Sequence, residues 1–136
     1  MLFSSIQGKV LLIASQYDSE AIPDILNINC LKNGTTGKTL KDCDANQLAN
    51  IEQYRKVFIN FMNNFLHFSK NNVWSIACSQ HVYAVWGEFY DNPLQKIPES
   101  TGQTVRGVIE EFVFEPLKRI ELIDDGPWPA NSACAN

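Results

Sequence analysis

Two short apolar runs, separated by a long stretch with helical periodicity, constrain the fold of this chain more than any other feature. The first run is Val10 to Ala14 and the second begins at Val73. Continuous apolar runs of this length are typical of strands in a parallel sheet that is covered on both faces. In chain order the pattern predicts a strand, a loop, a long helix, a second strand, a loop, a second helix and a tail, which is an α/β fold.

The helices are predicted from apolar residues that recur every three or four positions. The long helix is expected from Asp44 to about Ser69, with Asp44 as N-cap and Gln47 completing a variant of the capping box. Its apolar stripe, which we assign to core packing, consists of Leu48, Ile51, Tyr54, Phe58, Phe61, Phe65 and Phe68. The second helix is expected to open at Thr101 and to stop near Pro116. The segment from Ala21 to Lys41 is expected to be a loop that begins with a short helical turn.

Each predicted strand is followed by a residue type that can take part in acid–base chemistry. Asp18 ends the run that begins at Lys9, and His81 ends the run that begins at Asn72. An acid and then a histidine at consecutive strand ends is the order in which hydrolases of the Ser, Asp, His type deliver the last two members of their triad. The other histidine, His67, lies on the long helix and is expected to be a partly exposed structural residue.

Length and charge set limits on the partners of the chain. It has 136 residues, of which 45% are hydrophobic, and a formal net charge of −4. The length predicts one domain, and the charge offers no basic surface for nucleic acid. No stretch approaches the roughly 18 apolar residues that a membrane span requires. The cysteines form no Cys-x-x-Cys pair that would suggest zinc or a redox motif, and no cofactor is predicted.

The four cysteines favour disulfides and therefore an oxidising compartment. Four cysteines allow three pairings; the favoured one joins Cys30 to Cys43 across a short polar loop and Cys78 to Cys134 in the tail. Asn33 begins the glycosylation sequon Asn-Gly-Thr inside the first loop. We expect a secreted or lumenal protein whose signal peptide is not in this sequence, because the N-terminal apolar run is short and lacks a suitable cleavage site.

The order and spacing of several elements resemble the pectin acetylesterase family of carboxylesterases, which includes the animal carboxylesterase Notum. These elements are Tyr17-Asp18, Asn29-Cys30, Asp42-Cys43, Gln47-Leu48, Ile51-Glu52-Gln53-Tyr54-Arg55, Cys78 with His81, Ile120 to Asp124, Pro127-Trp128-Pro129 and Cys134. The resemblance implies the C-terminal part of an α/β-hydrolase-like fold, in which Asp18 is the triad acid and His81 the general base. It also implies acetylated polysaccharide as the substrate. After His81 the chain has Val82 and Tyr83, where the plant enzymes usually have a cysteine and a glutamine.

The nucleophile of such an enzyme is not present in this sequence. None of the seven glycines frames a serine in a Gly-x-Ser-x-Gly elbow. The resemblance therefore predicts a fragment, 1–136, that is inactive alone and needs the N-terminal part of the same domain. In such a fragment both strands are expected to expose edges and apolar faces, which would make it marginally soluble.

Two other functions remain open at this stage. The parent enzyme could remove the acyl group from an acylated protein, as Notum does, which would require a deep apolar pocket. Alternatively, the chain could be a non-catalytic, disulfide-stapled secreted module whose aromatic segment, 83–90, binds carbohydrate or protein.

Overall fold

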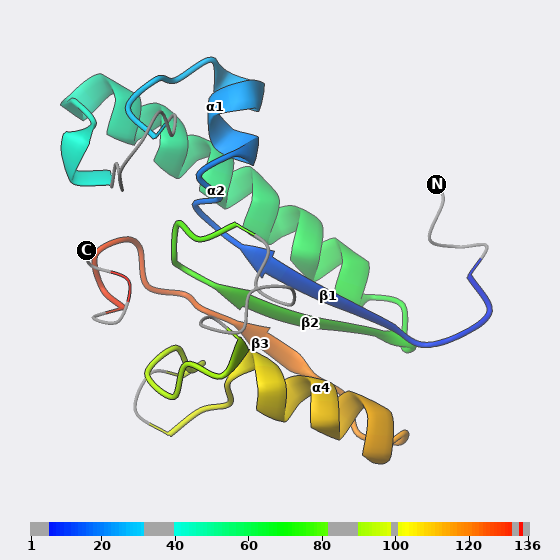
Figure 1. Cartoon of the computed structure of the whole chain (residues 1–136). Helices are drawn as coiled ribbons and strands as arrows, with labels where there is room; N and C mark the ends of the chain where they lie inside the picture. Colours follow the sequence, from blue (N-terminus) through cyan, green and yellow to red (C-terminus); the bar gives the residue numbers. More distant parts are fainter. Residues whose placement is uncertain (1–5, 32–39, 82–89, 99–100, 132–133, 135–136) are drawn as a thin grey trace.

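The computed structural model describes residues 6–31, 40–81, 90–98, 101–131 and 134. Within these ranges the chain forms a mixed α/β structure around a small parallel sheet (Figure 1). The predicted α/β class is confirmed at this level. Asn33 and most of the aromatic segment 83–90 lie outside the described residues, and so do Val82 and Tyr83.

The sheet has three parallel strands in the order β1-β2-β3: β1 (Val10–Ser15), β2 (Asn71–Ile76) and β3 (Glu121–Ile123). The register places Ala14, Ser75 and Ile123 in one row across the sheet. All residues of β2 are buried, whereas most of β1 is only half-buried. The expectation that both strand runs expose an edge is therefore wrong for the second run, because the unforeseen β3 covers it.

Helices cover both faces of the sheet, because side chains of successive strand residues point to opposite faces. Helix α2 (Ala45–Leu66) packs on the face that carries Val10, Leu12 and Val73. Helix α4 (Val105–Phe114) packs on the other face, against Trp74 and Ile76. Figure 1 shows the two helices on opposite sides of the strands. A third cluster lies beyond the strand ends, where the short helix α1 (Ala21–Leu26) meets α2.

The boundaries of α2 confirm the predicted cap and correct the predicted end. The Asp44 carboxylate accepts hydrogen bonds from the amides of Asn46 and Gln47, and the Gln47 side chain accepts one from the Asp44 amide, which is a capping box. The helix ends at Leu66, three residues earlier than expected, with an exposed His67 at its C-cap.

Part of the predicted aromatic stripe of α2 is not core. Phe61 and Phe68 are 44% and 47% exposed, while the helix buries Arg55, Met62 and Leu66, none of which the stripe included. The buried face is therefore rotated relative to the predicted one. Tyr54, Phe58, Phe61 and Phe65 still form a continuous stack of rings along α2, with centroids 6.1 to 6.4 Å apart.

The second predicted helix begins later than expected. Thr104 is the N-cap of α4, because its side chain accepts a hydrogen bond from the Gly107 amide. Thr101 lies in a turn, and Gln103 forms an isolated antiparallel bridge with Ile97. The bridge thus keeps Gln103 extended, and the helix begins only after Thr104. The helix ends at Phe114, before Pro116, as predicted.

Two disulfides fasten the loops to this framework, Cys30 with Cys43 and Cys78 with Cys134, which are the pairs favoured by the sequence. The first joins the segment after α1 to Cys43, which directly follows the 3₁₀ helix η2 (Leu40–Asp42) and precedes α2. The second joins the residue just beyond β2 to the tail. No helix in the described part of the chain is long and apolar enough to cross a membrane.

Candidate active site

Asp18 and His81 meet at the carboxyl end of the sheet. The two chain segments continue side by side beyond the strands, because the amides of Tyr17 and Ser19 donate to the carbonyl oxygens of Cys78 and Ser79. This pairing places Asp18, which follows β1, beside His81, which follows β2. The Nδ1 atom of His81 lies 2.8 Å from Oδ2 and 3.0 Å from Oδ1 of Asp18.

The orientation of Asp18 is fixed by the start of α1. Its Oδ1 accepts hydrogen bonds from the backbone amides of Glu20, at 2.9 Å, and Ala21, at 2.8 Å. The carboxylate therefore satisfies amides of the first helical turn, which have no partner within the helix. An Asp at this position can be explained as a helix cap alone, but a cap does not require the second contact with a histidine.

The contact determines which nitrogen of His81 is available for chemistry. An ionised carboxylate can only accept hydrogen bonds, so in the neutral ring the proton must lie on Nδ1. The Nε2 atom is then an unprotonated base. The His81 side chain is 43% exposed and that of Asp18 21%. Glu20 is a second carboxylate near the ring, with its Oε2 atom 3.9 Å from Nε2.

A small cavity of about 260 Å³ adjoins Asp18 on the side of β1. Ile13, Ala14, Tyr54 and Phe58 supply its apolar wall, and Ser15 and Ala21 complete it. Burial raises the pKa of Tyr54, and the negative charge of Asp18 raises it further. Tyr54 is therefore a neutral phenol at neutral pH.

Behind the exposed pair lies a buried polar group that the sequence did not reveal. We call it the Arg55 cluster: the side chains of Gln16, Tyr17, Glu52 and Arg55 and the carbonyl oxygens of residues 124–126. Arg55 Nε donates to Gln16 Oε1 at 2.7 Å, and Nη2 donates to the three carbonyl oxygens at 3.0 to 3.3 Å. Arg55 is only 5% exposed.

Tyr17 joins this cluster to the segment after β3. Its hydroxyl donates to the carboxylate of Glu52 and accepts a hydrogen bond from the amide of Trp128 at 2.8 Å. Burial raises the pKa of Tyr17 well above its usual range, and the hydrogen bond to Glu52 acts in the same direction. Tyr17 directly precedes Asp18, so the Arg55 cluster anchors the backbone that presents the carboxylate.

Fold and site together define an α/β protein with a carboxylate–histidine pair at the carboxyl edge of its parallel sheet, the edge where open α/β sheets bind their ligands. A comparison with protein families narrows this class: the family model described as Pectinacetylesterase matches residues 1–135. The chain belongs to the pectinacetylesterase family, which is a family of esterases. No curated protein and no solved structure matches the chain.

The candidate residues thus fall into three sets. Asp18 and His81 are in direct contact, and the four cysteines form the two disulfides. Asn33 lies outside the described residues, so its glycosylation stays a prediction.

Arg55 and Gln16 were missed, although the run Glu52-Gln53-Tyr54-Arg55 was among the elements that carried the resemblance. No cluster of three or more potential metal ligands occurs among the described residues.

Proposed function

We propose that Asp18 and His81 are the acid and the general base of a serine carboxylesterase that removes acetyl groups from a polysaccharide. The observation that carries the proposal is the 2.8 Å contact between the two side chains at neighbouring strand ends, in a chain of the pectinacetylesterase family. The chain order, acid before histidine, is that of the α/β-hydrolases.

The geometry suits the steps of ester hydrolysis. A serine hydroxyl attacks the acetyl carbonyl carbon while its proton passes to His81 Nε2, and the imidazolium then gives this proton to the departing sugar oxygen. Water attacks the acyl-enzyme in the same way, releases acetate and regenerates the serine. Asp18 holds the ring in the required tautomer and stabilises the imidazolium, a role for which a carboxylate on Nδ1 is suited.

The serine of this mechanism is proposed to come from sequence that precedes the given chain. No Gly-x-Ser-x-Gly elbow occurs here, and β1 has no strand partner on its outer side among the described residues. Further parallel strands could pair with that edge and bring the elbow next to His81. The two disulfides favour a secreted or lumenal setting for the whole enzyme.

Release of acetate from an acetylated polysaccharide tests the proposal. We expect no release by the 136-residue chain, and release by a gene product extended upstream to include a serine elbow. In the extended protein Asp18→Asn is expected to lower kcat by about 10⁴, the effect of the same change in a serine protease triad. His81→Ala should have a comparable effect. Asp24→Asn, an exposed acid on α1, is the control that leaves kcat unchanged.

Two results would contradict the proposal. If the 136-residue chain hydrolyses esters and His81→Ala abolishes this activity, the nucleophile lies within the chain. If the extended protein carries an elbow and is folded but releases no acetate, the assignment of the pair to this reaction is wrong.

A further inference from the structure

The outer edge of β3 has no strand partner among the described residues, because β3 is the last strand in the order β1-β2-β3. Toward β2, the carbonyl oxygen of Ile120 accepts a hydrogen bond at 2.9 Å and the amide of Asp124 donates one at 2.8 Å. Backbone groups of successive residues in a strand point to opposite sides, so those of Glu121 and Ile123 face away from β2. The edge therefore offers the amides and carbonyl oxygens of these two residues to a further strand.

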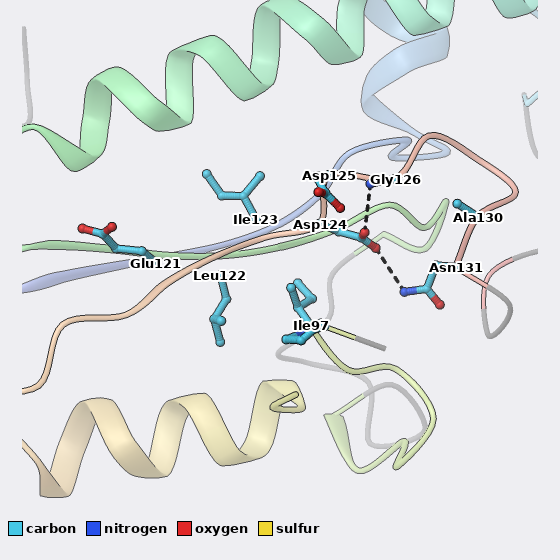
Figure 2. A pocket seen from close by; sticks show the side chains of 10 residues that line it. Ile97, Glu121, Leu122, Ile123, Asp124, Asp125, Gly126, Ala130 and Asn131 are labelled. Carbon is cyan, nitrogen blue, oxygen red and sulfur yellow. Dashed lines mark hydrogen bonds between the residues drawn. The ribbon is translucent and has the colours of Figure 1, made fainter. Parts of the chain in front are cut away.

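Open space lies along this edge. Two cavities, of about 440 Å³ at its carboxyl end and about 400 Å³ at its amino end, are both lined by Glu121 and Leu122. Figure 2 shows the cavity at the carboxyl end, with α2 above β3, α4 below it, and Ala130 and Asn131 across from Asp124. Glu121 itself is exposed. The edge is therefore accessible between the two helices.

The charges along the edge are separated by sign. In chain order the segment is Lys118-Arg119-Ile120-Glu121-Leu122-Ile123-Asp124-Asp125. Basic residues thus precede β3, and acidic residues follow it. The cavity at the carboxyl end is lined by Glu121, Asp124 and Asp125, with no lysine or arginine among its described lining residues. A complementary partner must therefore place a basic group at this end of the strand.

The same segment of a second copy meets this requirement when the two copies run antiparallel. A twofold axis through Leu122 places Glu121 of each copy opposite Ile123 of the other, and each such pair exchanges both of its N–H···O bonds. Two residues further out in the same register, Arg119 of each copy faces Asp125 of the other. Opposite charges therefore meet at both ends, since a twofold contact repeats each interaction. A parallel pairing would instead align like charges.

Arg119 and Asp125 are accessible for this contact. The Arg119 side chain is 40% exposed; it pairs with Glu121 of its own chain and donates to the carbonyl oxygen of Leu66. A guanidinium has five N–H donors, so Arg119 can donate to a further carboxylate. Asp125 is exposed, and the hydrogen bond that it makes to Arg55 uses its carbonyl oxygen.

The alternative explanation of these charges is that they keep the edge unpaired. Short strands and charged residues commonly protect sheet edges, because like charges meet when two copies approach. Here the signs are separated along the strand, so antiparallel copies attract each other. A strand of three residues buries little surface, and we therefore expect a weak dimer.

We propose that the outer edge of β3 binds the same edge of a second copy in antiparallel orientation and joins the two three-stranded sheets into one. This contact is independent of the proposed catalytic role. The Asp18–His81 pair follows β1 and β2, so the interface leaves it open, and the two pairs lie at opposite ends of the joined sheet. Upstream strands that pair with β1 would leave the β3 edge free in the extended protein.

The full 136-residue chain tests the proposal without a substrate. Sedimentation velocity from micromolar to millimolar concentration should show a reversible equilibrium between monomer and dimer. Hydrogen exchange of the Glu121 and Ile123 amides should slow as the concentration rises, because pairing protects them. A chain that stays monomeric at millimolar concentration overturns the proposal. So does a dimer that protects instead the outward amides of β1, those of Leu11 and Ile13.

Glu121→Pro removes an outward amide that the contact requires. Proline is tolerated on an edge strand when the missing N–H faces solvent, so we expect the monomer to fold and the dimer Kd to rise at least about tenfold. Glu121→Thr is the matched control: it removes the same carboxylate but keeps the amide, and should change the Kd by less than about threefold. Melting temperatures establish that both variants fold. Unchanged dimerisation of a folded Glu121→Pro variant would refute the contact.

Charge reversal tests the register. Arg119→Glu and Asp125→Arg each place like charges opposite one another, and each should raise the Kd about tenfold at low ionic strength. An equimolar mixture of the two variants should dimerise again, because opposite charges meet at both ends of the mixed dimer. Neither partial unfolding nor aggregation would produce this rescue. If both variants fold and the mixture is no more dimeric than either alone, the proposed pairing is wrong.

Discussion

The exposed Asp18–His81 pair and the buried Arg55 cluster lie at the same end of the sheet but differ in the number of their partners and in their access to solvent. Arg55 is 5% exposed and makes four hydrogen bonds through Nε and Nη2, whereas the His81 side chain is 43% exposed and contacts two carboxylates. The consecutive residues Gln16, Tyr17 and Asp18 serve both groups. The Arg55 cluster holds the strand end in place, and the Asp18–His81 pair, to which we assign the catalytic role, stays accessible to solvent.

The largest effect is expected from Arg55→Met, which removes the central donor of the buried Arg55 cluster. Removing the guanidinium leaves Gln16 Oε1 and the carbonyl oxygens of residues 125 and 126 without this donor, while the carbonyl oxygen of Asp124 keeps only the bond from Gln16 Nε2. The free energy of unfolding should therefore fall by about 3–5 kcal/mol. Urea unfolding measures this loss. Lys56→Met, at the exposed neighbouring position, is the control and should change stability by less than about 0.5 kcal/mol. A loss below 1 kcal/mol in Arg55→Met would show that the cluster is not a structural anchor.

Tyr17→Phe should have an intermediate effect, because it removes one hydroxyl from the same cluster. The Trp128 amide loses its acceptor and Glu52 loses its donor, which should cost about 1–3 kcal/mol of unfolding free energy. The same urea experiment applies. Tyr54→Phe is the matched control, since no hydrogen bond of the Tyr54 hydroxyl is part of the cluster. Equal losses in the two variants would argue against a special role for Tyr17.

Alkaline pH offers a finer test of burial. The pKa of Tyr17 is raised from 10.0 by burial and by the hydrogen bond to Glu52, so the folded state keeps the phenol proton that the unfolded state loses. The stabilisation is complete below about pH 10 and is lost as the pH rises above that value toward the folded pKa, by at most about 1.4 kcal/mol per pH unit for one group. Tyr54 contributes in the same direction. Unfolding free energies between pH 8 and 11 should therefore fall less steeply in Tyr17→Phe. An unchanged slope in that variant would contradict the assignment.

The smallest effect is expected from Asp18→Asn on the exposed side. The amide oxygen of Asn can still accept from Glu20 and Ala21, and exposed ion pairs contribute little. Stability should change by less than about 0.5 kcal/mol, in contrast to the large loss of kcat in the extended enzyme. If Asp18→Asn instead lowers the free energy of unfolding by more than about 2 kcal/mol, the Asp18–His81 pair stabilises the fold. Its contrast with the Arg55 cluster would then be wrong.

The sequence predicted those parts of the molecule whose signal is local. The apolar runs of β1 and β2 and the capping residues of α2 depend on neighbours within a few positions, and the structure confirms them. The helix at Thr101 was placed too early because Thr101 lies in a turn and Gln103 is held extended by a bridge with Ile97, a pairing that no apolar pattern announces. Strand β3 has only three residues and no alternation that distinguishes it from a loop.

The candidate site was predictable only in part, for a similar reason. Asp18 and His81 could be identified because each follows an apolar run, and the resemblance to a family linked them. Arg55 carries a charge on a helix and would ordinarily be assigned to the solvent face. Its partners lie 39 and about 70 positions away in the chain, so no short pattern reveals that it is buried. A cavity at the end of β3, lined by residues from 97–98, 121–126 and 130–131, is likewise formed by segments that meet only after folding.

The shared oxygen of Asp18 couples two motions that would otherwise be independent. Oδ1 accepts the amides of Glu20 and Ala21 and also lies 3.0 Å from the His81 ring. A fluctuation that unwinds the first turn of α1 therefore also weakens the contact between Asp18 and His81. The rates at which these two amide protons exchange with solvent should therefore report how often the contact between Asp18 and His81 is broken, and they can be measured without an activity assay.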